Sequence, residues 1–317
     1  MQKHTMVFLL ILFFSVQYGY SQTAGTTSFE FLRNQYSARG AAMGGNLMAV
    51  KNDIHGILYN PGTLAGNSDR QWQISYIDHL LDFKSGFLAY SQPLKSVGNV
   101  YAGILYFNYG SFDETDEFGD KTGRSFNASE FALTTGFSNH LGNGFDYGIG
   151  VKFLYSSLDT YNASALSLDA GLLYDVPIME NLTLGLAMLN LGTMINKYTT
   201  EKEKLPLIVQ FGFAKKLEHL PLLLTGSLQD ITVSQDNSTD FLKRFALGGE
   251  FDISEIIKFR LGYQHQINQD VKPVGRTILS GFSLGLGIMW QQFRLDYSYS
   301  NFGDLGSQNR VGVSGSL

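Results

Sequence analysis

The chain has 317 residues, of which 16% are charged and 14% are aromatic, and its net charge is −5. The charged fraction lies below the roughly 25% that is usual for soluble domains, whereas glycine is abundant. A mean hydropathy near zero argues against a bundle of membrane helices, and the acidic balance argues against a surface for nucleic acid. The absence of cysteine excludes disulfides, thiolate metal sites and a lipid-modified N-terminal cysteine.

The N-terminus begins with a short basic region at Lys3 and His4, followed by an apolar run from Val7 to Val16 and then by polar residues. This order is typical of a secretory signal peptide. An apolar run of about ten residues is too short to cross a membrane as a helix, which disfavours an uncleaved anchor. We therefore expect residues 1–21 to be a signal peptide that is removed near Ser21.

Residues 22–70 differ from the rest of the chain because they are rich in small side chains and lack long alternation. Asp53 is a suitable N-cap for a short helix that runs toward Tyr59 and ends at Pro61. Such a segment could fold as a hatch, or plug, inside a barrel mouth, or it could lie under the barrel as an ordinary extension. The sequence leaves both interpretations open.

From residue 71 to residue 317 the chain consists almost entirely of strand signals. Many of the segments are long enough for transmembrane strands, which need about 9–11 residues, whereas strands of globular proteins usually have five or six. We expect about fourteen strands, at residues 72–78, 83–92, 97–109, 129–139, 144–157, 162–175, 181–192, 206–215, 221–233, 242–252, 256–266, 277–289, 292–300 and 308–316.

The stretch from Phe145 to Tyr155 shows clear alternation. Its odd-numbered side chains are large and apolar or aromatic, while its even-numbered ones are mostly small or charged. Alternate side chains of a strand point to opposite faces, so one face of this strand is apolar. That pattern suits a soluble sheet packed on a core as well as a barrel wall in lipid, and it does not choose between them.

The lengths of the connections favour the barrel. The even-numbered connections are short, as at His140–Asn143, whereas every long connection is odd-numbered, as at Gly110–Ala128 and Thr193–Leu205; two odd ones are short. Bacterial barrels have short periplasmic turns and longer extracellular loops. We therefore predict an all-β fold, a transmembrane antiparallel β-barrel. Its fifth strand would run outward from Phe145 with the odd-numbered side chains in lipid.

This orientation turns a set of charged side chains toward the lumen. They could line a solute pathway, or they could form an ion-pair network that fills the barrel and holds the N-terminal segment. Because both signs of charge occur, the network is the favoured interpretation. The candidate lumen residues are Glu130, Asp146, Lys152, Asp169, Glu250, Arg260, Arg294 and Asp296.

No group of residues has the convincing pattern of a catalytic or metal site. The string Gly281–Gly285 matches a nucleophile elbow, but Ser283 lies in a strand pattern with no helix signal after it. The acidic residues of Gly110–Ala128 could bind calcium, although solvated acidic loops are common and the spacing follows no known calcium loop. We expect a non-enzymatic protein with no cofactor and no metal.

Two N-terminal stretches, Ser37–Gly45 and Leu58–Gly62, resemble the start of the PorV/PorQ family of outer-membrane proteins, which are relatives of FadL-type fatty-acid channels. They contain a candidate hatch motif, made of Arg39, Gly44, Gly45, Asn60 and Pro61. Further stretches in matching order place the chain closest to the PorQ members, at Phe29–Leu32, Asn108–Asp113, Glu117–Asp120, Glu203–Pro206, Lys216–Glu218 and Arg260–Tyr263. The ending at Leu317 departs from the aromatic C-terminus that is common in barrels.

The resemblance implies a location in the outer membrane of a Bacteroidetes-like bacterium and a role in type IX secretion. The barrel would anchor a surface protein of the PorZ type in a complex with PorU and PorV, which processes secreted cargo and links it to lipopolysaccharide. Outer-membrane lipid would surround it. The candidate docking residues lie in the long loop, at Phe112, Asp113, Glu117 and Phe118. The alternative functions are a FadL-like channel for hydrophobic small molecules and a mainly structural barrel.

Overall fold

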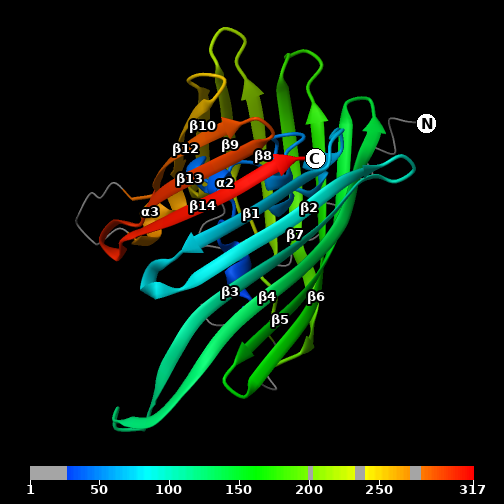
Figure 1. The fold of residues 1–317 in the computed structure, drawn as a ribbon. Coiled ribbons are helices and arrows are strands. Elements are labelled where there is room, and N and C mark those ends of the chain that lie inside the picture. Colours follow the sequence, from blue (N-terminus) through cyan, green and yellow to red (C-terminus); the bar gives the residue numbers. More distant parts are fainter. Residues whose placement is uncertain (1–26, 199–202, 233–239, 272–279) are drawn as a thin grey trace.

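The computed structural model describes residues 27–198, 203–232, 240–271 and 280–317, so the expected signal peptide lies outside the described residues. In this described part, fourteen antiparallel strands pair in sequence order, and β1 pairs with β14 to close the sheet into a barrel (Figure 1). The predicted all-β barrel of about fourteen strands is confirmed. In the same residues, no helix is long and apolar enough to cross a membrane.

The strand bounds follow the expected segments through most of the chain. They are β1 (Gln71–Asp78), β2 (Lys84–Leu94), β3 (Gly98–Thr115), β4 (Lys121–Gly142), β5 (Phe145–Leu158), β6 (Tyr161–Asp175), β7 (Leu182–Asn196), β8 (Ile208–Lys216), β9 (Leu222–Leu228), β10 (Phe245–Asp252), β11 (Ile257–Gln264), β12 (Phe282–Trp290), β13 (Phe293–Asn301) and β14 (Ser307–Ser316).

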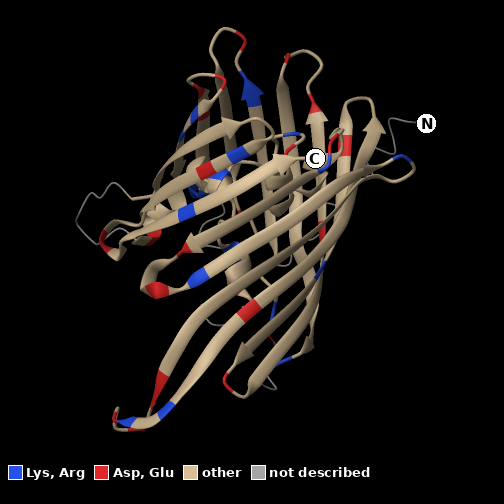
Figure 2. Ribbon diagram, in the orientation of Figure 1, with Lys and Arg blue, Asp and Glu red and all other residues tan. Residues whose placement is uncertain are grey.

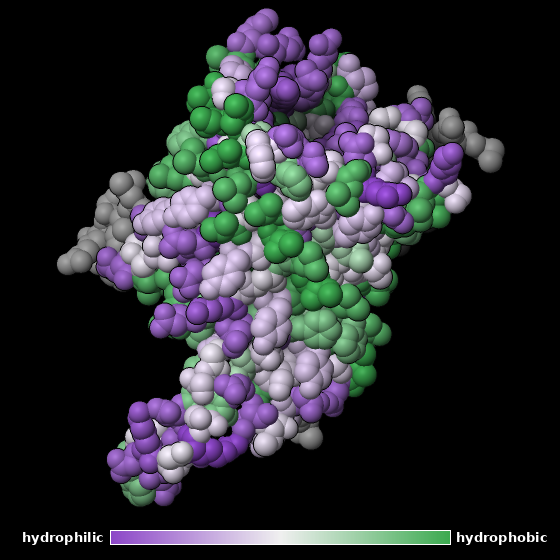
Figure 3. Space-filling view, viewed as in Figure 1, coloured by the Kyte–Doolittle hydropathy of each residue, from purple (hydrophilic) through white to green (hydrophobic). Residues whose placement is uncertain are grey.

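The two faces of the wall differ as the alternation predicts. In β5, Asp146, Gly148 and Leu154 are buried in the lumen, whereas Ile149 and Val151 are 43% and 44% exposed on the outside. Apolar side chains cover much of the visible wall, and hydrophilic ones gather toward its two ends (Figure 3). Since the outer apolar side chains have no protein core to cover them, this surface suits lipid, as in transmembrane barrels.

One hairpin of the barrel is much longer than the sequence predicts. The segment Gly110–Ala128 was expected to be a loop, but β3 continues to Thr115 and β4 begins at Lys121, with Phe112 paired opposite Phe126. These residues form an arm, which reaches well beyond the neighbouring hairpin β5–β6 (Figure 1) and carries charges of both signs near its tip (Figure 2). The loop prediction was wrong because strand pairing persists outside the membrane, where no lipid face imposes apolar alternation.

Other differences lie at the same end of the barrel, which we call the arm end. The expected strand 221–233 stops at Leu228, shortly before Asp230, whose φ of 51° is left-handed. The 3-10 helix η5 (Asp240–Arg244) precedes β10. Helix α3 (His265–Val271) follows β11, in place of the end of the expected strand 256–266 and the start of the expected loop after it. The expected strand start at 277 lies outside the described residues.

The described N-terminal residues 27–70, which we call the hatch, occupy the lumen. Their helices are η1 (Glu30–Arg33), α2 (Ala38–Ala42), η2 (Ile54–Leu58) and η3 (Pro61–Leu64). Every residue of α2 is buried, and this helix packs on β12 and β13, while η3 packs on β5 and β6. Asp53 caps η2 through the amide of His55, at 2.9 Å, as predicted from the sequence. The hatch therefore fills the barrel and does not lie under it.

Lumen-facing glycines let the hatch backbone approach the wall closely. A Cβ on Gly148 would lie 2.3 Å from the carbonyl carbon of Pro61, and one on Gly171 would lie 1.8 Å from Oδ1 of Asn60. On the other side of the lumen, a Cβ on Gly262 would lie 2.2 Å from the amide nitrogen of Gly44. Real Cβ atoms do not tolerate such distances, so the small positions of the alternating strands are contact sites for the hatch.

Candidate functional site

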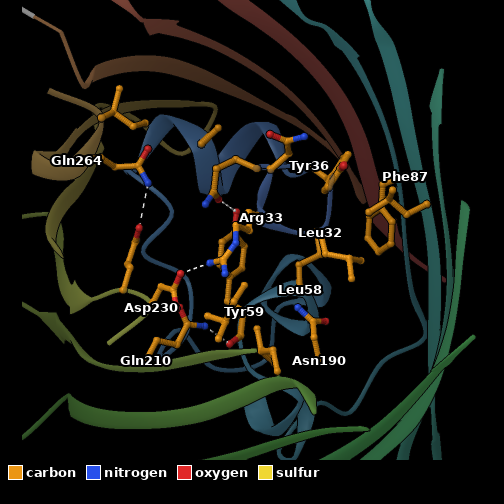
Figure 4. Close-up of a pocket in the computed structure, with 18 of the residues that line it drawn as sticks. Leu32, Arg33, Tyr36, Leu58, Tyr59, Phe87, Asn190, Gln210, Asp230 and Gln264 are labelled. Carbon is orange, nitrogen blue, oxygen red and sulfur yellow. Dashed lines mark hydrogen bonds and ion pairs between the residues drawn. The ribbon is translucent and has the colours of Figure 1, made fainter. Parts of the chain in front are cut away.

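A cavity of about 400 Å³ lies inside the barrel between the hatch and the strands (Figure 4). Side chains from hatch and wall line it together. In Figure 4, Leu32, Tyr36 and Phe87 lie on one side of the cavity, while Asp230 and Gln264 lie on the other. The volume is within the range of small-molecule sites in proteins.

The apolar side of the cavity is built by hatch and strands together. Leu32 comes from η1, Phe87 from β2 and Leu105 from β3, while Ala132 continues the surface on β4. Phe87, Leu105 and Ala132 belong to the buried cluster into which Phe31 of the hatch packs. The hatch therefore completes an apolar surface that the wall alone would leave open to the lumen.

The polar side is built mainly from amide and charged side chains that already have protein partners. Nε2 of Gln264 donates to Oε1 of Gln229 at 3.0 Å, and Nε2 of Gln229 donates to the carbonyl oxygen of Gly44 at 3.0 Å. Arg33 of the hatch forms an ion pair with Asp230. These contacts bind the hatch to the ends of β9 and β11 that lie at the arm end. The same side chains line the cavity.

A charge-balanced network joins α2 and η2 to the wall. Arg39 pairs with Asp53 and donates to Glu250 at 2.8 Å and 2.6 Å. Arg260 donates to Glu250 at 2.5 Å and to Asp296 at 2.7 Å. Arg294 is the third arginine of the network, because it lies 3.5 Å from Asp53 and 2.9 Å from Asp296. Three arginines thus meet three carboxylates, so the buried charges compensate one another.

The charge state of the hatch groups follows from this network. Burial alone would raise the pKa of Asp53, but Arg294 and Arg39 hold it well below its ordinary value. Burial alone would lower the pKa of Arg39, but Glu250 and Asp53 hold it above its ordinary value. Both groups therefore stay charged across the physiological pH range.

His55 sits beside the network as a neutral group. Its Nδ1 lies 2.8 Å from the hydroxyl of Ser37, and its Nε2 lies 4.0 Å from Asp296. Burial lowers its pKa to about 4, although Asp53 acts in the opposite direction and Arg294 adds to the lowering. The folded protein therefore holds an uncharged imidazole at neutral pH.

The seated hatch is expected to lose stability as the pH falls from about 6.5 to about 4. In this window the unfolded chain binds a proton at His55 and the folded chain does not, so the free energy of unfolding falls, by on the order of 3 kcal/mol. Protease digestion of the hatch between pH 7 and pH 4 checks this. A His55→Gln variant should show a flatter profile there. A wild-type profile that is flat from pH 6.5 to 4 would contradict the assignment.

The eight candidate lumen residues do not form one network. Glu250, Arg260, Arg294 and Asp296 belong to the network around Arg39. The remaining four lie in three separate contacts, in which Lys152 pairs with Asp169 at 2.8 Å, Asp146 pairs with Lys51 of the hatch at 2.6 Å, and Glu130 accepts from Tyr109 at 2.6 Å.

The candidate hatch motif is spread over two turns of the hatch. Gly44 and Gly45 end α2 with φ of 66° and 75°, and the amide of Gly45 donates to the carbonyl oxygen of Gly40 at 2.8 Å. Asn60 caps η3 through the amide of Gly62 at 2.8 Å, and Pro61 occupies the first turn of that helix. Reasoning from the sequence missed Lys51 and His55 as partners of the wall, because single charged or polar residues in a non-periodic segment give no pairing signal.

The candidate docking residues lie on the arm, away from the cavity. Phe112 stacks on Phe126 with ring centroids 5.6 Å apart, and Phe118 is 82% exposed in the turn at the tip, beside Glu117. Asp113 pairs with Lys121 at 2.6 Å. No cluster of three potential metal ligands occurs in the described ranges, and Ser283 lies inside β12 without a following helix.

Comparisons with known proteins reveal likeness in structure and not in sequence. No family model matches the chain, and no curated protein sequence matches it. The toluene transporter TodX of P. putida superposes with a TM-score of 0.57 at 14% identity, over 89% of this chain and 98% of that one. The fold is shared.

Two further solved structures are similar in the same way. The toluene transporter TbuX of Ralstonia pickettii superposes with a TM-score of 0.56 at 13% identity, over 88% of this chain and 96% of that one. A FadL homologue of Pseudomonas aeruginosa gives a TM-score of 0.54 at 12% identity, over 90% of this chain and 98% of that one. These likenesses establish a FadL-like barrel fold with an N-terminal segment that is not part of the strands.

Proposed function

We propose that this chain is an outer-membrane channel that takes small, largely apolar molecules into the cavity beside the hatch. The proposal rests on the cavity of about 400 Å³ inside the barrel, whose apolar side is formed by Leu32, Phe87 and Leu105. A second hollow, of about 640 Å³, lies beside hatch residues 49–52 near the short turn that joins β6 to β7. The hatch therefore borders the first cavity toward the arm end and the second hollow toward the short turns at the opposite end. A passage gated by the hatch requires such a space on each side of it. The toluene transporters of similar fold support the same function.

Uptake by intact cells tests the channel function. Expression in a Gram-negative host that lacks such a channel is expected to raise the initial uptake rate of a labelled monoaromatic hydrocarbon severalfold over the empty vector. Ala132→Phe should return the rate toward the vector, because the added ring occupies the cavity.

The neighbouring residue offers a matched control. Leu133→Phe places the same ring on the outer face, where Leu133 is 42% exposed, and should leave uptake unchanged. Uptake equal to the vector, or equal loss in both variants, would rule out transport through this cavity.

The arm supports a second candidate function, a surface anchor of the type IX secretion system in a Bacteroidetes-like outer membrane. The tip of the arm projects beyond the hairpin β5–β6 (Figure 1). Phe118 in this tip is exposed. A partner of the PorZ type, in a complex with PorU and PorV, would dock there through Phe112, Asp113, Glu117 and Phe118. The resemblance of the sequence to the PorV/PorQ family supports this candidate.

Shortening the arm is expected to release such a partner from membranes while the barrel still inserts. Asp113 pairs opposite Ser125, so replacement of residues 114–124 by Asn-Gly closes the hairpin with a two-residue turn. Pull-down from solubilised outer membrane measures the bound partner. The amount of the variant barrel in the outer membrane serves as the control and should equal that of the wild-type protein. A partner that remains bound would contradict docking through Glu117 and Phe118 at the tip of the arm.

A further inference from the structure

Arg310 is a buried cation that has no acidic partner in the described part of the chain. It projects from β14, is 2% exposed and lines the cavity. Its Nε donates to the carbonyl oxygen of Gln35 at 2.8 Å, Nη1 donates to the hydroxyl of Ser300 at 2.9 Å, and Nη2 donates to Oε1 of Gln308. All three acceptors are neutral. A guanidinium group has five N–H donors, so two remain beyond these contacts.

Unlike Arg310, the other buried arginines and cavity cations among the described residues have acidic partners. Arg39, Arg244 and Arg260 all form ion pairs with carboxylates, and so do the cavity cations Arg33 and Lys152. Burial of an unpaired charge costs several kcal/mol, which is why such charges are normally compensated. Arg310 is the exception among these groups, and its guanidinium faces a cavity that is large enough for a ligand.

A neighbouring group responds to the same uncompensated charge. His79 lies in the connection between β1 and β2, and its Nδ1 is 3.1 Å from Nε2 of Gln308. The other amide atom of Gln308, Oε1, accepts the hydrogen bond from Arg310. Burial lowers the pKa of His79 to about 4, and the positive charge of Arg310 adds to the lowering. The imidazole is therefore neutral and supplies no additional cation at this place.

We propose that the cavity binds a compact amphipathic anion, whose oxyanion pairs with Arg310 and whose apolar body lies against Leu32, Phe87 and Leu105. This inference rests on the proposed function in that it uses the same cavity. An oxyanion would compensate the buried guanidinium with charge-assisted hydrogen bonds, which neutral ligands cannot provide. The ligand class thus differs from the hydrocarbons named for the toluene transporters.

Titration calorimetry on the full barrel in a neutral detergent tests the ligand class. The probes are 4-ethylbenzoate and its neutral isostere 4-ethylbenzamide. The carboxylate is expected to bind the wild-type protein about tenfold or more tighter than the amide. Arg310→Gln should remove this preference, while Arg310→Lys should retain part of it because the positive charge stays in place.

The control is Arg124→Gln, a substitution on the arm outside the cavity, which should leave the preference unchanged. Equal binding of the two probes to the wild-type protein overturns the inference without any variant, and so does a preference that survives in Arg310→Gln. The two proposals can fail separately. A carboxylate preference without cellular uptake of either the hydrocarbon or labelled 4-ethylbenzoate would refute the channel and support the ligand class, whereas hydrocarbon uptake without that preference would do the reverse.

Discussion

Glu250→Ala is expected to destabilise the seated hatch by about 3–5 kcal/mol, since it breaks a buried ion-pair network on one side. Glu250 joins Arg39 of the hatch to Arg260 of the wall, and their side chains are 7% and 0% exposed. Without the carboxylate, three arginines would share two acidic partners in a largely buried site. Chemical unfolding of the purified barrel and protease digestion of the hatch both measure the loss.

Two matched variants separate the charge from other effects. Glu250→Gln retains the shape and one acceptor oxygen but removes the charge, so an intermediate loss is expected. Glu255→Ala removes a carboxylate from the exposed turn between β10 and β11 and should have no effect. If Glu250→Ala leaves both the unfolding midpoint and the digestion rate unchanged, the network does not hold the hatch.

The barrel could be predicted from the sequence because the membrane imposes a strong local rule. Each wall strand must alternate lipid-facing apolar side chains with lumen-facing small or polar ones, and this pattern can be read within a single strand such as β5. Where the strands leave the membrane the rule no longer applies. The arm is therefore the place where the prediction of a loop failed, and α3 was missed at the same end.

The lumen could be predicted only in its composition. The charges on the inner face were identified one by one, but their partners come from other strands and from the hatch, far away along the chain. Arg39 was singled out by a family resemblance and Asp53 as a helix cap, and neither pattern shows that the two form an ion pair. Likewise, no local signal marks Arg310 as a buried charge that has no counter-ion among the described residues. Such features depend on the closed barrel as a whole.

The glycines of β5 and β6 lead to a prediction that depends on shape and not on charge. The double variant Gly148→Ala, Gly171→Ala is expected to displace the segment around Asn60 and Pro61 from the wall. The new Cβ atoms would lie 2.3 Å and 1.8 Å from the nearest hatch atoms, so the hatch must move. Overpacking of this kind costs about 1–3 kcal/mol at each position.

Displacement of η3 would open space between the hatch and the strands on which it packs. The reconstituted double variant is therefore expected to conduct ions better than the wild-type barrel, and hydrogen exchange in the hatch should accelerate. The control is Gly86→Ala, Gly249→Ala, where the nearest atoms are 3.4 Å from the new Cβ and are ordinary contacts. A double variant at residues 148 and 171 with wild-type conductance and wild-type exchange would mean that these close contacts do not position the hatch, and that the charged network around Arg39 is sufficient to hold it.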